Sequence, residues 1–191
     1  MFIRSERLFL RPGWPEDWTE LLKQIDDWAV IAQLIEMAET AKAPTIPAYP
    51  EVSDRRFPQF VVTLPTCNAP DDDGARAIGC AGLLSSEHGG ELVYWIAPEY
   101  WGQGYATEAV RALLSLARTL GHRQIVALGH ADNAASGRVL AKLGFHATGE
   151  TTLRKCRARG VLTAPLVLRC DLGEPSDCDG GMVGDSARHA A

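Results

Sequence analysis

Residues 92–108 read LVYWIAPEYWGQGYATE and carry more structural information than any other stretch of this chain. An apolar run ends at Pro98, a short loop follows, and the remainder has the pattern of a helix. The loop has small residues at alternate positions, Gly102, Gly104 and Ala106, which lets its backbone approach a ligand closely. A helix N-terminus adds a positive electrostatic field. The segment therefore predicts a cradle for a pyrophosphate, and with it a phosphorylated cofactor.

Length and composition indicate a single domain, which we place at residues 1–172. The formal net charge of -5 argues against general nucleic-acid binding. No apolar run reaches the ~18 residues that a membrane span needs, and charges interrupt the N-terminal apolar stretch, unlike a signal peptide. The cysteines are odd in number, 5, and lack CxxC spacing, which favours a reduced, cytoplasmic protein and no metal site. Residues 173–191 are polar and glycine-rich, so we expect a disordered tail there.

Hydrophobic periodicity divides the chain into strands and helices. The clearest helix is 107–120, whose apolar residues recur at the 3.6-residue period until Gly121 ends it. Pro165 places the last strand at an edge or at a bulge. An ordered, proline-rich loop is expected over 43–58 and a turn at 71–74. The expected strands are 2–11, 60–64, 75–84, 92–96, 124–128, 145–153 and 161–168, the last two forming a pair, and the expected helices are 15–25, 28–39, 107–120 and 133–143.

A second motif, DNAASGRVLAKLGF at residues 132–145, narrows the choice of cofactor. Glycine-rich turns before helices also occur in Rossmann and P-loop nucleotide sites. This chain has no G-x-G-x-x-G, however, and no lysine–serine pair after the loop. Asn133 is a favourable N-cap and Ser136 a common first-turn residue, so the second motif begins a helix.

These two motifs, together with SERLFLRP at residues 5–12, make the chain resemble the GNAT acyl-CoA-dependent N-acetyltransferases over residues 4–170. It looks most like the branch of the ribosomal-protein alanine acetyltransferases. The resemblance implies an α/β fold with a mixed, mostly antiparallel sheet, flanked by helices and splayed at 94–97. It implies direct acetyl transfer from acetyl-CoA to a primary amine, on a protein N-terminus or a small molecule, without a metal. The acceptor stays unnamed, and relatives with this fold often form homodimers.

The resemblance assigns the donor site to the backbone around the glycine loop. The family motif Gln/Arg-x-x-Gly-x-Gly/Ala falls on residues 101–106, with Trp101 in place of the first polar residue. Because the family binds through backbone N–H groups, this replacement is compatible with binding. A backbone N–H of the splayed strand would stabilise the oxyanion of the tetrahedral intermediate. The implied cofactor-binding residues are Trp95, Ile96, Ala97, Trp101, Gly102, Gln103, Gly104, Tyr105, Ala106, Thr107, Asn133 and Ser136.

Catalysis needs a base for the amine and an acid for the leaving thiolate. We assign the base to Glu91, directly or through water; a plain solvent-facing carboxylate at a strand end is the alternative, and His88 and His130 are the next candidates. Many GNAT enzymes use a tyrosine acid at the position that is Leu140 here, and leucine has no proton to donate. The acid role therefore moves to Ser136 or to water.

Two other functions stay open at this point. The missing tyrosine is compatible with a non-catalytic acyl-CoA-binding or regulatory module. The glycine loop alone is compatible with a module that binds another nucleotide. Turnover on amines would distinguish an enzyme from the non-catalytic module. A comparison of the binding of CoA with that of NAD and ATP would identify a module that binds another nucleotide.

Overall fold

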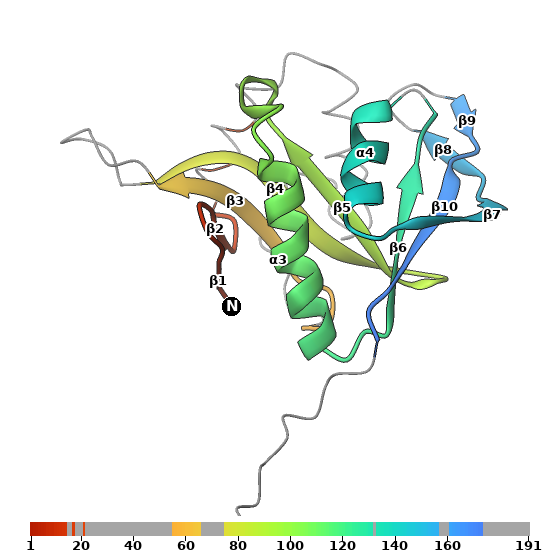
Figure 1. Ribbon diagram of the computed structural model, residues 1–191, viewed down its shortest axis with the longest axis horizontal. Helices are drawn as coiled ribbons and strands as arrows, with labels where there is room; N and C mark the ends of the chain where they lie inside the picture. The colour runs from red at the N-terminus through yellow and green to blue at the C-terminus, as the bar shows by residue number, and fades with distance from the viewer. Residues whose placement is uncertain are drawn as a thin grey trace, which may run out of the picture.

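The computed structural model describes residues 1–14, 17, 21, 55–65, 75–131, 133–156 and 161–173 (Figure 1). These residues form an 8-stranded sheet in the order β1-β2-β3-β4-β5-β6-β10-β7 and a separate hairpin, β8–β9. Neighbouring strands of the sheet are antiparallel except β5 and β6, which are parallel. The expected α/β class with a mixed, mostly antiparallel sheet is confirmed. The elements are β1 (Ile3–Arg4), β2 (Phe9–Arg11), β3 (Gln59–Pro65), β4 (Ala75–Ser86), β5 (Gly89–Ile96), η1 (Pro98–Tyr100), α3 (Tyr105–Thr119), β6 (Gln124–Gly129), α4 (Ala134–Lys142), β7 (His146–Thr151), β8 (Arg154–Cys156), β9 (Val161–Thr163) and β10 (Leu166–Asp171).

The central elements β3, β4, β5, β6, α3 and α4 lie where the periodicity predicts them, with shifts of a few residues at their ends. The N-terminal segment differs from its prediction. One strand over 2–11 is wrong, because β1 and β2 form an antiparallel pair with a turn between them. Ser5 closes the turn: its N–H donates to the carbonyl oxygen of Leu8, and its Oγ accepts from the N–H of Leu8. Serine commonly closes turns in this way.

The C-terminal segment is also more divided than a simple strand pair. After β7 the chain forms the hairpin β8–β9 and then returns as β10, which lies between β6 and β7. Pro165 lies directly before β10, and the register of β10 against β7 shifts between Leu166 and Leu168. The expectation of a bulge near Pro165 is therefore confirmed. An edge position for the last strand is wrong, since β7 occupies that edge.

Several expected features lie outside the described residues. They are the helix at 28–39, most of the helix at 15–25, the loop over 43–54, the turn at 71–74 and the tail beyond residue 173. The boundary of the domain at residue 172 stays a prediction, although Leu172 packs into the main core. No helix in the described part of the chain is both long and apolar enough to cross a membrane.

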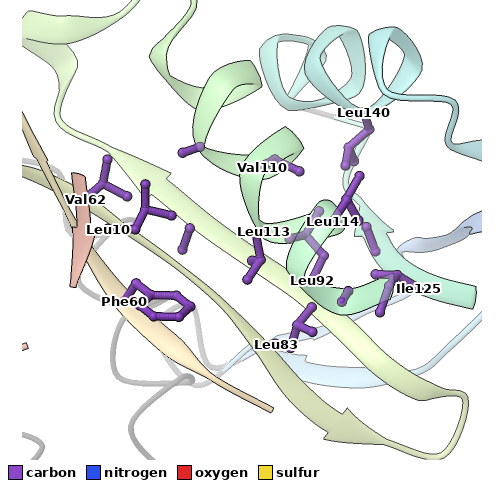
Figure 2. Packing of buried hydrophobic residues seen from close by; sticks show 14 of the residues in the cluster. Leu10, Phe60, Val62, Leu83, Leu92, Val110, Leu113, Leu114, Ile125 and Leu140 are labelled. Atoms are coloured by element: carbon purple, nitrogen blue, oxygen red, sulfur yellow. The ribbon is translucent and has the colours of Figure 1, made fainter. Parts of the chain in front are cut away.

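Helix α3 packs its apolar face on one side of the sheet (Figure 1). Because side chains alternate along a strand, Leu92, Tyr94 and Ile96 of β5 point toward α3. Trp95 points to the opposite face and joins a second cluster there. Figure 2 shows the main core, in which side chains from five strands pack against side chains from both helices: Leu10, Phe60, Val62, Leu83, Leu92, Ile125, Val110, Leu113, Leu114 and Leu140.

A polar network ties the N-terminal turn to the start of α3. The carboxylate of Glu108 accepts hydrogen bonds from the Ser5 hydroxyl at 2.8 Å, from the Arg7 backbone N–H at 2.7 Å and from Arg7 Nε at 2.8 Å. The Arg7 guanidinium also donates to the carbonyl oxygen of Gln103 at 3.1 Å and lies over the ring of Tyr105. The motif SERLFLRP therefore braces the loop that precedes α3.

The ionisation of Glu108 should make this brace sensitive to acid. Burial alone raises the pKa of Glu108, but the hydrogen bonds from Arg7 and Ser5 outweigh burial and lower it overall. A lowered pKa in the folded protein means that the stabilisation is present above the unfolded-state pKa of ~4.3 and disappears as the pH falls through the folded value. We expect Glu108→Gln to be less stable than the native protein at neutral pH, with the difference shrinking in acid.

Urea unfolding at a series of pH values measures this difference. Glu99→Gln, an exposed change near the same loop, is the control and should show a small difference at every pH. A deficit of Glu108→Gln that stayed constant down to acid pH would contradict the role of the carboxylate charge.

The core makes a second prediction about stability. Leu113 is fully buried on the apolar face of α3. Leu113→Ala should lower the free energy of unfolding by about 2–5 kcal/mol, because it removes buried methyl groups and leaves a cavity. Ser115→Ala, an exposed change in the same helix, should stay within about 0.5 kcal/mol. Chemical denaturation of both variants checks the difference, and equal effects would place Leu113 outside the core.

Candidate active site

The parallel strands β5 and β6 pair only over a short distance. Residues 90–92 lie opposite residues 125–127, yet β5 continues to Ile96 and β6 to Gly129. Figure 1 shows the two strands diverging toward the end of the sheet where α4 lies. The expected splay over 94–97 is therefore present. In the described part of the chain, no strand pairs with the backbone of β5 that faces β6 beyond Leu92. Apart from the Ile96 carbonyl oxygen, which accepts a hydrogen bond from Trp101, the N–H and C=O groups of this edge can bind an extended ligand.

The glycine loop follows β5 through the single turn η1. Gly102 and Gly104 have φ angles of 74° and 83°, in the left-handed region, and Gly104 is the N-cap of α3. A Cβ on Gly102 would meet no atom within 4 Å, so the backbone conformation and not crowding requires glycine there. Among the described residues, none accepts a hydrogen bond from the N–H groups of residues 102–107. A run of free N–H groups at a helix N-terminus is suited to an anion.

Trp101 anchors this loop to the end of β5. Its indole Nε1 donates to the carbonyl oxygen of Ile96 at 2.6 Å, while the residue as a whole is 61% exposed. Its backbone N–H donates to the carbonyl oxygen of Pro98. The Trp101 N–H is therefore engaged within the protein. The Ala97 N–H is engaged as well, since it donates to Ile78 at 2.9 Å. Of the twelve residues assigned to the cofactor, Ala97, Trp101, Asn133 and Ser136 thus have backbone N–H groups that donate within the protein.

The strand before the loop depends on a glycine that the sequence patterns did not single out. A Cβ on Gly79 of β4 would lie 2.1 Å from the carbonyl oxygen of Trp95 and 2.9 Å from Cα of Ile96. Only glycine allows β4 and β5 to approach this closely. A glycine inside a strand pattern is itself a signal of close backbone approach. Trp95 lies on the face away from α3, and its Nε1 has no hydrogen-bond partner among the described residues.

Glu91 lies within β5, in the part that still pairs with β6. Its residue is only 4% exposed, so the alternative of a solvent-facing carboxylate is wrong. It is not isolated, because it takes part in an interaction inside the protein. By strand alternation it shares a face with Trp95, opposite to α3 and α4. Burial in this position suits a base that is shielded from bulk water.

The second motif forms the first turn of α4 as expected. Asn133 is the N-cap, and its side-chain oxygen accepts the N–H of Ser136 at 3.0 Å. Leu140 is 1% exposed and packs in the main core, consistent with its having no chemical role. The hydroxyl of Ser136 lies 2.7 Å from the hydroxyl of Tyr94, which reaches across from β5. The structure thereby brings together two segments that the motifs left apart.

Tyr94 is the polar residue of this site that our sequence reasoning missed. Burial raises its pKa, while the hydrogen bond with Ser136 acts in the opposite direction. Its position in the alternating pattern, two residues from Leu92 and two from Ile96, was a usable signal. That spacing places its ring on the face of α3 and α4.

The two histidine candidates lie at the ends of strands β5 and β6, outside the glycine loop. His88 is in the hairpin turn before β5, at the opposite end of that strand from the loop. His130 is exposed after β6, and its carbonyl oxygen accepts the N–H of Asn133. Among the described residues, no three His, Cys, Asp or Glu side chains are grouped in a way that could hold a metal ion.

Comparisons with known proteins agree with this geometry. The model of the acetyltransferase (GNAT) domain family matches residues 7–146. The chain is 37% identical over 73 residues to YoaA of Bacillus subtilis (strain 168), described as an uncharacterized N-acetyltransferase. That match covers 38% of this chain, and the chain spans about two fifths of the relative, 41% of its length.

Solved structures show the same fold at low identity. An acetyltransferase of the GNAT family from Bacillus anthracis is 20% identical, with 90% of this chain and 99% of that chain covered and a TM-score of 0.58. A spermidine N-acetyltransferase from Vibrio cholerae, in complex with CoA and spermine, is 16% identical, with 88% and 97% covered and a TM-score of 0.60. Because the family model spans well over half of the chain, this protein belongs to the GNAT acetyltransferase family.

Proposed function

We propose that this protein transfers an acetyl group from acetyl-CoA directly to a primary amine. The observation that carries the proposal is the combination of the splayed β5–β6 pair with the free N–H groups at the start of α3. The loop suits the pyrophosphate of CoA, and the open edge of β5 suits the amide groups of its pantetheine arm. A spermidine N-acetyltransferase of the same fold was solved with CoA, which supports this choice of donor.

The two sides of the sheet suggest separate roles in the reaction. Glu91 lies on the face away from α3, whereas Ser136 lies on the face of α4. An acyl group held in the gap between β5 and β6 would meet the amine from one face and release the thiolate toward the other. Glu91 then accepts a proton from the amine, directly or through water, and Ser136 donates toward the sulfur. A free N–H of β5 in the gap stabilises the oxyanion.

A buried cysteine supports direct transfer over an acetylated enzyme intermediate. Cys80 lies opposite Trp95 in the β4–β5 ladder. Burial raises its pKa to about 12, so the group stays a thiol at neutral pH and is a poor nucleophile. Buried free thiols are also in keeping with the cytoplasm, where we place the protein; we further expect it to act as a homodimer.

The glycine loop provides the first test of cofactor binding. Gly104→Ala forces an L side chain into the left-handed region, at a cost of roughly 1–2 kcal/mol, and displaces the loop N–H groups. We expect the dissociation constant of CoA, measured by calorimetry, to rise by about 10-fold. Gly149→Ala is the matched control, because Gly149 in β7 has φ 82° and open space around it. Equal loss of CoA affinity in the two variants would show that the glycine loop does not contribute to CoA binding.

Glu91→Gln tests the assigned base. The change keeps the shape of the side chain, so CoA affinity should be unchanged while acetyl transfer falls by about 10²–10⁴-fold. The loss should be larger for a lysine amine, whose pKa is ~10.4, than for an α-amine at ~7.7–8.0, which needs less help to lose its proton. Glu87→Gln in the exposed hairpin turn is the control. Undiminished transfer in Glu91→Gln would assign the base elsewhere.

Release of free thiol in the presence of a panel of amines separates the enzyme from the alternative. The panel should include N-terminal peptides, polyamines, aminoglycosides and small amino compounds. Turnover on any of them supports the acetyltransferase. Tight binding of CoA without turnover on any of them would favour a non-catalytic acyl-CoA-binding or regulatory module.

A further inference from the structure

We propose that Tyr94 is a positioning residue for the acid step, and that it relays a proton through Ser136 to the leaving thiolate. The inference rests on the proposed function, because it needs a thiolate in the gap between β5 and β6. It adds a residue from β5 to an acid role that the second motif alone places on α4. Tyr94 acts through Ser136 and need not touch the substrate itself.

The contact between the two residues spans the splay. Tyr94 comes from β5, beyond the last residue that pairs with β6, and Ser136 comes from α4, which follows β6 in the chain. The two hydroxyl oxygens are 2.7 Å apart, and both side chains are half-buried. A pantetheine arm that enters the gap therefore passes beside this pair of hydroxyl groups.

Either hydroxyl can donate in this contact, and the relay takes Tyr94 as the donor. Each hydroxyl has one proton to donate. The Tyr94 oxygen lies 2.7 Å from Ser136 Oγ and 3.3 Å from the Ser136 carbonyl oxygen, so Oγ is the closer acceptor. When Tyr94 donates to Oγ, the Ser136 proton is free to point into the gap. The cap from Asn133 to the Ser136 N–H fixes the backbone that carries this hydroxyl.

The chemistry of the relay balances without a further reactant. As the tetrahedral intermediate collapses, the carbon–sulfur bond breaks and its electron pair goes to sulfur. The Ser136 proton moves to sulfur, the Tyr94 proton moves to the Ser136 oxygen, and water returns a proton to Tyr94. The amine has meanwhile given up one proton, so the products are an amide and a free thiol.

The phenol of Tyr94 makes the Ser136 hydroxyl a better proton donor. A phenol, with a pKa near ~10, is a far stronger acid than an aliphatic alcohol, so a serine backed by a phenol donates more readily than a serine alone. Burial raises the pKa of Tyr94 and so weakens it as an acid, whereas the hydrogen bond with Ser136 acts in the opposite direction. Leu140, by contrast, is enclosed in the core and contributes no donor.

Three variants test the relay through kinetics. Tyr94→Phe keeps the ring in the core and removes only the hydroxyl, so kcat should fall on the order of 10-fold while the KM for acetyl-CoA changes less than about 2-fold. Ser136→Ala should lower kcat by about 100-fold, and the double variant should be no slower than Ser136→Ala, because Tyr94 acts through Ser136. Tyr100→Phe, which removes a hydroxyl that lies 3.4 Å from Arg76, is the control.

Two kinetic outcomes would overturn the relay. Losses that multiply in the double variant would mean that the two hydroxyls act independently. Faster turnover or a lower KM in Tyr94→Phe would mean that the hydrogen bond closes the gap against the cofactor. Thermal unfolding of each variant confirms that the protein is folded before its rates are compared.

Binding of CoA and of desulfo-CoA, which lacks the sulfur, tests the relay without turnover. If the hydroxyl pair donates toward sulfur, the native protein prefers CoA over desulfo-CoA, and Tyr94→Phe reduces that preference. An unchanged preference in Tyr94→Phe overturns the relay while leaving donor binding intact. Failure of the native protein to bind either compound overturns the proposed function itself, so the two failures are distinguishable.

Discussion

Two adjacent parallel strands that stop pairing halfway along their length shape every part of this site. Unpaired backbone in the middle of a sheet is normally unfavourable, since each N–H and C=O needs a partner. Here β5 keeps its position because its other edge pairs with β4 along its full length. Gly79 permits the close approach of those two strands, and Trp101 ties the end of β5 to the loop. The unpaired edge of β5 is thus held in place by β4, which pairs with the opposite edge.

Where the two strands diverge, the side chains proposed for the two proton transfers lie on opposite faces of the sheet. Side chains alternate along β5, so neighbouring positions serve opposite sides of the sheet. The side chains of Glu91 and Trp95 lie on the face opposite to α3 and α4, whereas Tyr94 points toward these helices. A gap between the strands is the one place from which a bound group can meet both faces. In the proposed reaction this geometry keeps the proton acceptor and the proton donor from neutralising each other.

The sequence predicted the parts of the fold that depend on local pattern. The period of α3, the cap at Asn133 and the glycine loop are short-range signals, and each is found where expected. The N-terminal hairpin and the division of the C-terminal strands were missed, because the turn at Ser5 and the breaks at 152–153 and 164–165 interrupt patterns that read as continuous. At the site, the contact of Tyr94 with Ser136 joins residues 42 positions apart, and no local pattern encodes it.

The brace between the N-terminal turn and α3 has a consequence for how the protein is made. Arg7 and Glu108 are 101 residues apart, so the contact closes a long loop of chain. At a synthesis rate of about 5–20 residues per second, the N-terminal turn leaves the ribosome roughly 5–20 s before its partner helix. The glycine loop therefore cannot take its braced form until Arg7 and Glu108 have both been made. Long-range contacts of this kind slow folding, so the glycine loop takes its final form later than a segment held by local contacts alone.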